Sequence, residues 1–106
     1  MFFDRQARQV SKEVWKRLSS KPEYVRVAED TVSALDGTIS DVQTFWIGVG
    51  DRRHRLVFCT VVTRHRGATL TWGWSSEAAG RKGHRMVCDW LTGPVDVPPP
   101  NSFDGS

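Results

Sequence analysis

Three basic clusters, at residues 52–55, 64–66 and 81–85, are the groups in this chain best suited to chemistry with an anion. Residues 51–93 hold eight Lys/Arg against three Asp/Glu, whereas residues 1–50 hold seven of each. Arginine suits bidentate contacts to phosphate or carboxylate and stacks on bases. The clusters therefore favour an acidic partner, either nucleic acid or an acidic protein surface. The candidate contact residues are Arg52, Arg53, Arg55, Arg81, Lys82 and Arg85, with Arg64 and Arg66 secondary.

The same cations have a simpler reading, in which they are solvated turn residues that keep the protein soluble. In an antiparallel meander, the turn 52–55 and the segment 81–85 lie at one end of the sheet. The turn 64–66 lies at the opposite end, about 25–30 Å away for a strand of eight residues. Two of the three clusters can therefore merge into one patch, and the third cannot.

Three tryptophans, Trp46, Trp72 and Trp74, fall within segments that read as strands. On an exposed sheet face such rings stack bases, as in RNA-binding sheets. A domain of 106 residues also needs large apolar side chains inside it, and this favours the core for all three. We keep Trp74 among the candidate contact residues.

Each histidine lies in an Arg-rich segment, at positions 54, 65 and 84. Positive neighbours favour the neutral imidazole, which can act as a general base, as in small basic ribonucleases. No acid stands at a fixed spacing from any of them, and the nearest candidates are Asp51 and Glu77. The sequence therefore names no catalytic residue and favours a protein that is not an enzyme.

A metal site could use His84, Cys88 and Asp89, since residues four apart share a face of a helix. Structural zinc takes four ligands, and neither a Cys-x-x-Cys nor a His-Glu-x-x-His pattern is present. Cys59 lies within an apolar run, where a thiol is inert. We therefore expect no metal and no cofactor.

Two helices are expected at the N-terminus. Apolar residues recur at steps of three and four over residues 3–18, with Asp4 as a cap, and again over residues 24–35 after Pro22. Gly37 would end the second helix. A short link between the two predicts an antiparallel helical hairpin.

Strands are expected after Asp41, over residues 43–49, 56–63 and 68–75. The run 56–63 is apolar on both faces, which places it in the middle of a sheet. Residues 77–83 read as a basic loop, residues 84–91 as a short helix or a fourth strand with helix favoured, and residues 93–106 as an extended Pro-rich tail. The fold class is α+β: two N-terminal helices packed on a three- or four-stranded antiparallel meander, in one domain over residues 1–92.

The register of the last hairpin stays open. One loop length pairs Val61 with Leu70 and Cys59 with Trp72, and the next pairs Val62 with Leu70 and Thr60 with Trp72. A slip of one residue moves every side chain to the other face.

The strand Arg55-Leu56-Val57-Phe58 resembles the Arg-Leu-Val-Tyr strand of small toxin nucleases of the RelE/ParE type. That family packs a helical pair on an antiparallel sheet with basic strand ends. The resemblance covers four residues, and the family's initial strand and its basic, Tyr-bearing C-terminal end are not evident in this sequence. It implies a ribonuclease toxin as the third functional hypothesis.

The leading hypothesis is a small basic module that binds nucleic acid, or a nucleic-acid-handling complex, through its Arg-rich turns. The alternative is a protein-binding inhibitor or adaptor, of phage or mobile-element type, that occupies an acidic or nucleic-acid-binding surface of its partner. No apolar window reaches membrane-spanning length, and Met1-Phe2-Phe3-Asp4 does not begin a signal peptide. We therefore expect a cytoplasmic protein with reduced thiols.

Overall fold

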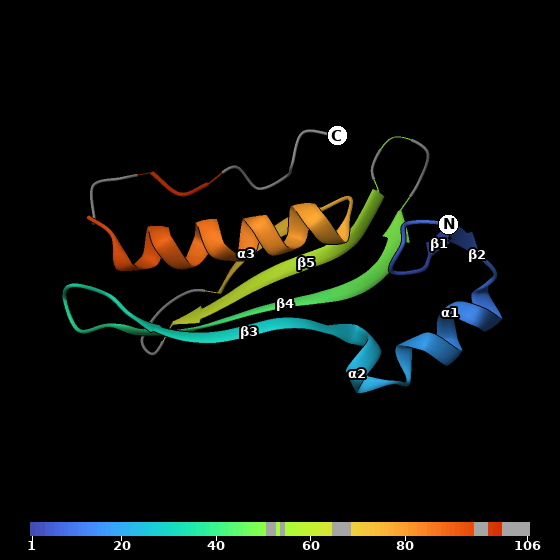
Figure 1. Cartoon of the computed structure of the whole chain (residues 1–106), viewed down its shortest axis with the longest axis horizontal. Helices are drawn as coiled ribbons and strands as arrows, with labels where there is room; N and C mark the ends of the chain where they lie inside the picture. Colours follow the sequence, from blue (N-terminus) through green and yellow to red (C-terminus); the bar gives the residue numbers. More distant parts are fainter. Residues whose placement is uncertain (51–52, 54, 65–68, 95–97, 101–106) are drawn as a thin grey trace.

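A computed structural model of the chain describes residues 1–50, 53, 55–64, 69–94 and 98–100. It is an α+β fold in which a long antiparallel sheet curls into a half-barrel beside one long helix (Figure 1). The elements in chain order are β1 (Phe2–Phe3), β2 (Gln9–Val10), α1 (Lys12–Ser19), α2 (Pro22–Val25), β3 (Arg26–Ser33), β4 (Ile39–Gly50), β5 (Arg55–Arg64), β6 (Leu70–Trp74) and α3 (Glu77–Thr92).

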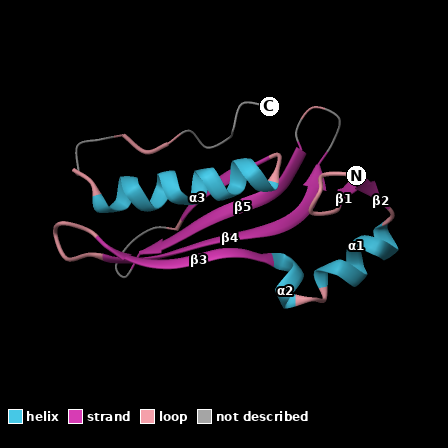
Figure 2. Cartoon of the chain, in the orientation of Figure 1, coloured by secondary structure: helices cyan, strands magenta, loops and turns pink. Residues whose placement is uncertain are grey.

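Six strands of the described residues form one sheet. Five of them follow the order β2-β1-β4-β5-β6. The sixth, β3, pairs with the same edge of β4 as β1 does (Figure 2). β4 is long enough for both neighbours: β3 pairs along Ile39–Phe45 and β1 pairs at Val49. The pairing of β4 with β5 is interrupted between Trp46 and Val49, where Gly48 has a φ of 64°. A side chain at Gly48 would meet the Phe3 carbonyl and the Trp46 ring, so this bend requires glycine.

The expected meander of three strands is confirmed in β4, β5 and β6, with β5 in the middle. Its register is the second of the two alternatives, because Val62 pairs with Leu70 and Thr60 with Trp72. This register puts Trp72 and Trp74 on the same face as Val62 and Thr60. All three tryptophans of the strands are buried, Trp46 at 2%, Trp72 at 3% and Trp74 at 5% exposure.

The helix that covers the sheet is α3, which contacts β3, β4, β5 and β6. It has sixteen residues rather than the short segment 84–91, and the expected loop 77–83 forms its first turns. Ser76 caps it by accepting a hydrogen bond from the Ala79 backbone N–H. Gly80 and Gly83 face the sheet, and this lets the helix approach closely: a Cβ at Gly83 would lie 2.2 Å from the Trp74 ring. Packing against Trp74 thus stabilises a helix whose glycines argued for a loop.

The first expected helix is wrong over residues 3–10, which form the hairpin β1–β2. The Asp4 carboxylate accepts hydrogen bonds from the backbone N–H groups of Gln6 and Arg8, so it closes the turn of this hairpin instead of capping a helix. The helix begins only at Lys12, where the Ser11 hydroxyl accepts from the Val14 N–H. Phe3 becomes a core residue with 1% exposure.

The second expected helix is wrong beyond Val25, because residues 26–33 form β3. This stretch contains the β-branched Val27, Thr31 and Val32, which favour a strand. Its pairing with β4 gives the backbone N–H and C=O groups along one edge of β3 hydrogen-bond partners. Gly37 has a φ of 87° and lies in the turn between β3 and β4, so it does not end a helix. The expected packing of two N-terminal helices over the sheet is replaced by α1 and α2 at one end of the molecule and α3 along the sheet (Figure 1).

Candidate functional site

Arg81, Lys82 and Arg85 are exposed side chains on α3, and together they are called the α3 basic face below. Positions 81, 82 and 85 fall within a narrow arc of the helix, opposite the buried stripe of Gly83, Val87 and Leu91. Lys82 and Arg85 have no ion-pair partner among the described residues. Their charges are therefore available to an anion in solution.

Arg81 shares a carboxylate with Arg5. Glu77 lies 2.8 Å from Arg5 and 3.0 Å from Arg81, so it bridges the N-terminal hairpin to the first turn of α3. Burial acts to raise the pKa of Glu77, but hydrogen bonds and charges from Arg5 and Arg81 outweigh it and lower the pKa below its usual 4.5. Two guanidinium groups against one carboxylate leave this corner of the molecule with a net positive charge.

Arg55 begins β5 and is exposed, with its guanidinium carbon 5.3 Å from the centre of the Phe3 ring. Trp74, the residue that precedes α3 by three positions, pairs with Phe58, so Arg55 and the start of α3 lie at the same end of β5. Arg53 is also exposed. Of the first cluster, Arg55 thus shares an end of β5 with the start of α3.

Arg64 lies at the other end of β5, stacked 5.4 Å from the centre of the Trp90 ring near the end of α3. Arg55 and Arg64 are the first and last of the ten residues of β5, so Arg64 is not part of the same surface. Arg52, Arg66, His54 and His65 lie outside the described residues.

Trp74 is a core residue. Its ring lies against Gly83, and its Nε1 donates a hydrogen bond of 2.8 Å to the Thr60 hydroxyl. A ring with 5% exposure cannot stack on a ligand at the surface, so we leave Trp74 out of the candidate contact residues.

His84 is enclosed between α3 and the sheet with 3% exposure, in a chain of hydrogen bonds that the sequence did not predict. Its Nδ1 lies 2.8 Å from the Thr44 hydroxyl, and its Nε2 lies 2.7 Å from the Asp30 carboxylate. The Thr44 hydroxyl lies 2.6 Å from that of Thr60, which accepts from Trp74. Asp30 was expected on a helix, and so its position next to residue 84 had no signal in the sequence.

With His84 neutral and its proton on Nε2, every hydrogen bond of this network can run in one direction. An indole N–H only donates and a carboxylate only accepts. With Trp74 donating to Thr60, each hydroxyl can pass its proton forward, from Thr60 to Thr44 and from Thr44 to Nδ1 of His84. His84 then donates from Nε2 to Asp30. In this hydrogen-bond network, every buried side-chain polar atom has a partner.

This geometry does not favour His84 as a catalytic base, although an acid does stand beside it. Both ring nitrogens are hydrogen-bonded and the side chain is 4% exposed, so neither nitrogen is open to a substrate while the Asp30 carboxylate lies on Nε2. Cys88, one turn along α3, is no better as a nucleophile. Burial raises the pKa of its thiol to about 11, and the carboxylates of Asp30 and Asp89 add to this effect.

Both cysteines are free thiols, with Cys59 buried in β5 and Cys88 partly buried on α3. Burial also raises the pKa of the Cys59 thiol. The donor atoms of Asp30, His84 and Cys88 lie within 4.8 Å of one another, so two of the three donors considered from the sequence, His84 and Cys88, lie close together. The carboxylate that joins them comes from β3, not from Asp89.

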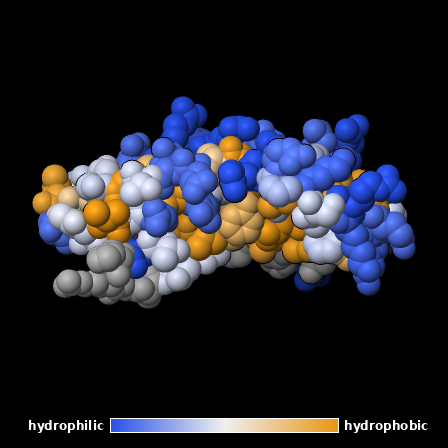
Figure 3. Space-filling model, turned by 90° about the horizontal axis from the view of Figure 1, so that it is seen from below, coloured by the Kyte–Doolittle hydropathy of each residue, from blue (hydrophilic) through white to orange (hydrophobic). Residues whose placement is uncertain are grey.

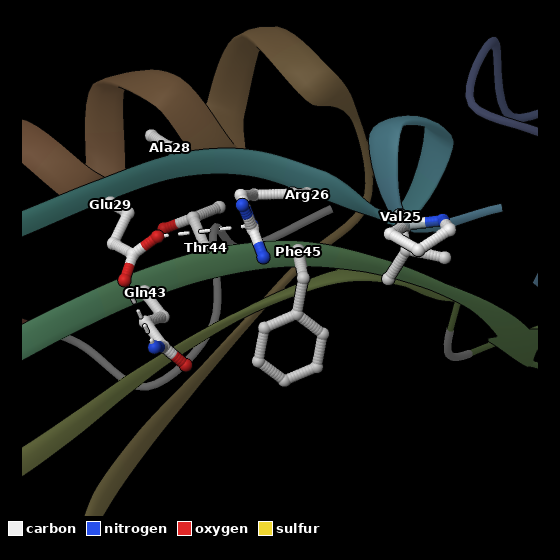
Figure 4. Close-up of a pocket in the computed structure, with 8 residues that line it drawn as sticks. Val25, Arg26, Ala28, Glu29, Gln43, Thr44 and Phe45 are labelled. Atoms are coloured by element: carbon white, nitrogen blue, oxygen red, sulfur yellow. Dashed lines mark hydrogen bonds and ion pairs between the residues drawn. The ribbon is translucent and has the colours of Figure 1, made fainter.

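A hollow of about 250 Å³ lies elsewhere, where α2 and the irregular start of β3 meet β4. Phe45 and Gln43 project on the side of the sheet away from α3, and Arg26 and Glu29 form an ion pair of 3.8 Å at the rim (Figure 4). Apolar surface continues along the middle of the molecule on this side, whereas the end with α1 is hydrophilic (Figure 3). The charged side chains that line the hollow, Arg26 and Glu29, are paired with each other.

None of the helices in the described part of the chain has the length and apolar character needed to cross a membrane. Comparisons with models of protein families, with curated proteins and with solved structures gave no match to this chain. The functional argument therefore depends on the site alone.

Proposed function

We propose that this protein binds nucleic acid through phosphate contacts from the α3 basic face and from Arg53 and Arg55 at the adjacent end of β5. The observation that supports this best is the exposure of Lys82 and Arg85 on one side of a rigid helix, with no carboxylate paired to either among the described residues. Cations without local partners attract an external anion more strongly than paired ones, so Lys82 and Arg85 are the principal contacts and Arg81, Arg53 and Arg55 are secondary.

The contacts available are of the kind that position a protein on nucleic acid without reading its sequence. Guanidinium and ammonium groups bind phosphate oxygens. The aromatic rings that could have read bases, Trp72 and Trp74, are buried. We therefore expect binding that depends steeply on salt and only weakly on base sequence.

The test is fluorescence anisotropy with a labelled DNA duplex and a labelled single-stranded RNA at low salt. The double charge reversal Lys82→Glu/Arg85→Glu should weaken binding by about tenfold or more, since two phosphate contacts become repulsive. The matched control is Arg26→Glu/Arg64→Glu, which changes the net charge equally at one position on the side of the sheet away from α3 and one at the far end of β5. Equal affinities for the Lys82→Glu/Arg85→Glu variant and the wild type would reject the proposal.

A protein partner is the outcome that would replace it. Capture from lysate that persists after nuclease treatment, and that is lost in the Lys82→Glu/Arg85→Glu variant, would assign the α3 basic face to an acidic protein surface. Capture that disappears with nuclease supports nucleic acid.

A further inference from the structure

We infer that Asp30, His84 and Cys88 form a binding site for one zinc ion, independent of the α3 basic face. The site joins β3 to α3: Asp30 is on the strand, and His84 and Cys88 lie one turn apart on the helix. The donor atoms, a carboxylate oxygen, an imidazole nitrogen and a sulfur, all lie within 4.8 Å of one another. Zinc is the common biological cation that accepts all three donor types.

The distances fit one ion after small movements. Donor atoms around a tetrahedral zinc ion lie about 3.2–3.7 Å apart, given metal–ligand distances of about 2.0–2.3 Å. Nε2 of His84 and the Asp30 oxygen are now 2.7 Å apart and would have to separate slightly. The Asp30 side chain is 58% exposed, so it can turn without disturbing the core.

A hydrogen bond to the second ring nitrogen orients the imidazole, as is usual for histidine ligands of metals. Its Nδ1 lies 2.8 Å from the Thr44 hydroxyl, which fixes the ring with Nε2 directed at Asp30. When Nε2 binds a cation, the ring proton resides on Nδ1, and the Thr44 hydroxyl can accept it because a hydroxyl has both roles. Thr44 then donates its own proton to Thr60, and the Thr60 proton loses Thr44 as its acceptor. This loss lowers the zinc affinity of the site.

Three donors lie here among the described residues, and zinc takes four, so a solvent molecule would complete the coordination. The exposed Asp30 and partly exposed Cys88 give the ion access from solution. Binding should stabilise the fold, since the ion ties the edge strand β3 to α3.

The test is equilibrium dialysis of the purified, reduced protein with zinc chloride, together with cobalt chloride as a spectroscopic probe. We expect one zinc ion per chain, a rise in melting temperature with zinc, and a thiolate-to-cobalt charge-transfer band. Cys88→Ala should abolish that band, and Asp30→Asn should weaken zinc binding by more than about tenfold. Both positions are at least partly exposed, so both variants should fold.

The controls come from the same chain. Asp89→Asn removes a carboxylate beside Cys88 on the same helix, and Cys59→Ala removes the other thiol; neither should alter zinc binding or the cobalt spectrum. Absence of stoichiometric zinc, or zinc binding that survives both Cys88→Ala and Asp30→Asn, would overturn the inference. Nucleic-acid binding is measured separately with the variants of Lys82 and Arg85, so the two proposals fail independently.

Discussion

At the scale of single residues, the chain of hydrogen bonds from Trp74 to Asp30 is the feature whose disruption should reduce stability most. Thr44 has 0% exposure, and it is the link between Thr60 and His84. Thr44→Val keeps the shape but leaves Nδ1 of His84 without a partner and the Thr60 hydroxyl with Trp74 as its remaining partner. We expect a loss of about 1–3 kcal/mol in the free energy of unfolding, measured by urea denaturation.

The control for this prediction is an exposed threonine in the same sheet. The Thr31 hydroxyl donates a hydrogen bond of 2.8 Å to Asp41 on the surface, where water can replace either partner. Thr31→Val should cost less than about 0.5 kcal/mol. Equal costs for the two substitutions would show that the buried chain adds nothing beyond an ordinary hydrogen bond.

Glu77 gives a second prediction at this scale, on acid stability. Because its pKa is lowered in the folded protein, its contribution is present in full above pH 4.5 and is lost as the pH falls through the folded pKa. Glu77→Gln should therefore lower the free energy of unfolding at pH 7 by about 0.5–1 kcal/mol.

The difference between wild type and Glu77→Gln should shrink below pH 4.5, as followed by urea denaturation at a series of pH values. Glu29→Gln is the matched control, since the ion pair of Glu29 with Arg26 is exposed and 3.8 Å long. A stability gap for Glu77→Gln that stays constant into acid would contradict the role of this carboxylate.

At the scale of elements, α3 contains two glycines whose substitution by alanine should have opposite effects. Alanine favours a helix by about 1 kcal/mol over glycine. At Gly80 the added Cβ meets Phe58 Cβ at 3.4 Å, an ordinary contact, so Gly80→Ala should be neutral or stabilising. At Gly83 it would lie 2.2 Å from the buried Trp74 ring, and Gly83→Ala should cost about 1–2 kcal/mol net.

Urea denaturation of the two alanine variants measures this difference. Both variants carry the same Gly→Ala substitution in the same helix, so the local packing is what differs. If both variants gain stability, the close approach of α3 to Trp74 is not the reason for glycine at position 83.

The elements also show where the sequence was informative. The meander was predictable because the run 56–63 is apolar on both faces and turn residues flank it. β3 was not, since the spacing of Val25, Ala28 and Val32 fits a helical stripe, and only the pairing with β4 over Ile39–Phe45 decides for strand. The same error hid Asp30, and with it the partner of His84. α3 was underestimated because Gly80 and Gly83 indicate a loop unless the neighbouring tryptophan is known.

At the scale of the whole molecule, charge must act locally, because a net charge of +3 is too small to attract nucleic acid by itself. The neutralising variant Lys82→Gln/Arg85→Gln should reduce the slope of log K against log salt by about 1.8 for duplex DNA, at about 0.9 per phosphate contact. Anisotropy titrations across a range of salt concentrations measure this slope.

A variant with the same net charge tests whether position matters. Arg26→Gln/Arg64→Gln also removes two cations, one on the other side of the sheet and one at the far end of β5. Its slope should match that of the wild type. Identical slopes for the two double variants would mean that the overall charge, not the α3 basic face, governs binding.

The sequence could place Arg53, Arg55, Arg81, Lys82 and Arg85 at the surface, but it could not show which of them have partners. Arg81 and Lys82 are neighbours in a basic cluster, yet only Arg81 has Glu77 one helical turn away. That Arg55 and the start of α3 lie at the same end of β5 followed from antiparallel topology alone and did not require the correct length of the helix.

The shared edge of β4 has a consequence for how the chain acquires this structure. Phe2 pairs with Val49, and the Phe3 carbonyl accepts a hydrogen bond from Trp46, so the first strand docks only after a segment more than forty residues downstream exists. On the ribosome, β1 emerges well before β4, and its two phenylalanines stay unprotected until β4 follows. Nascent-chain release before residue 50 should therefore give a product prone to aggregation.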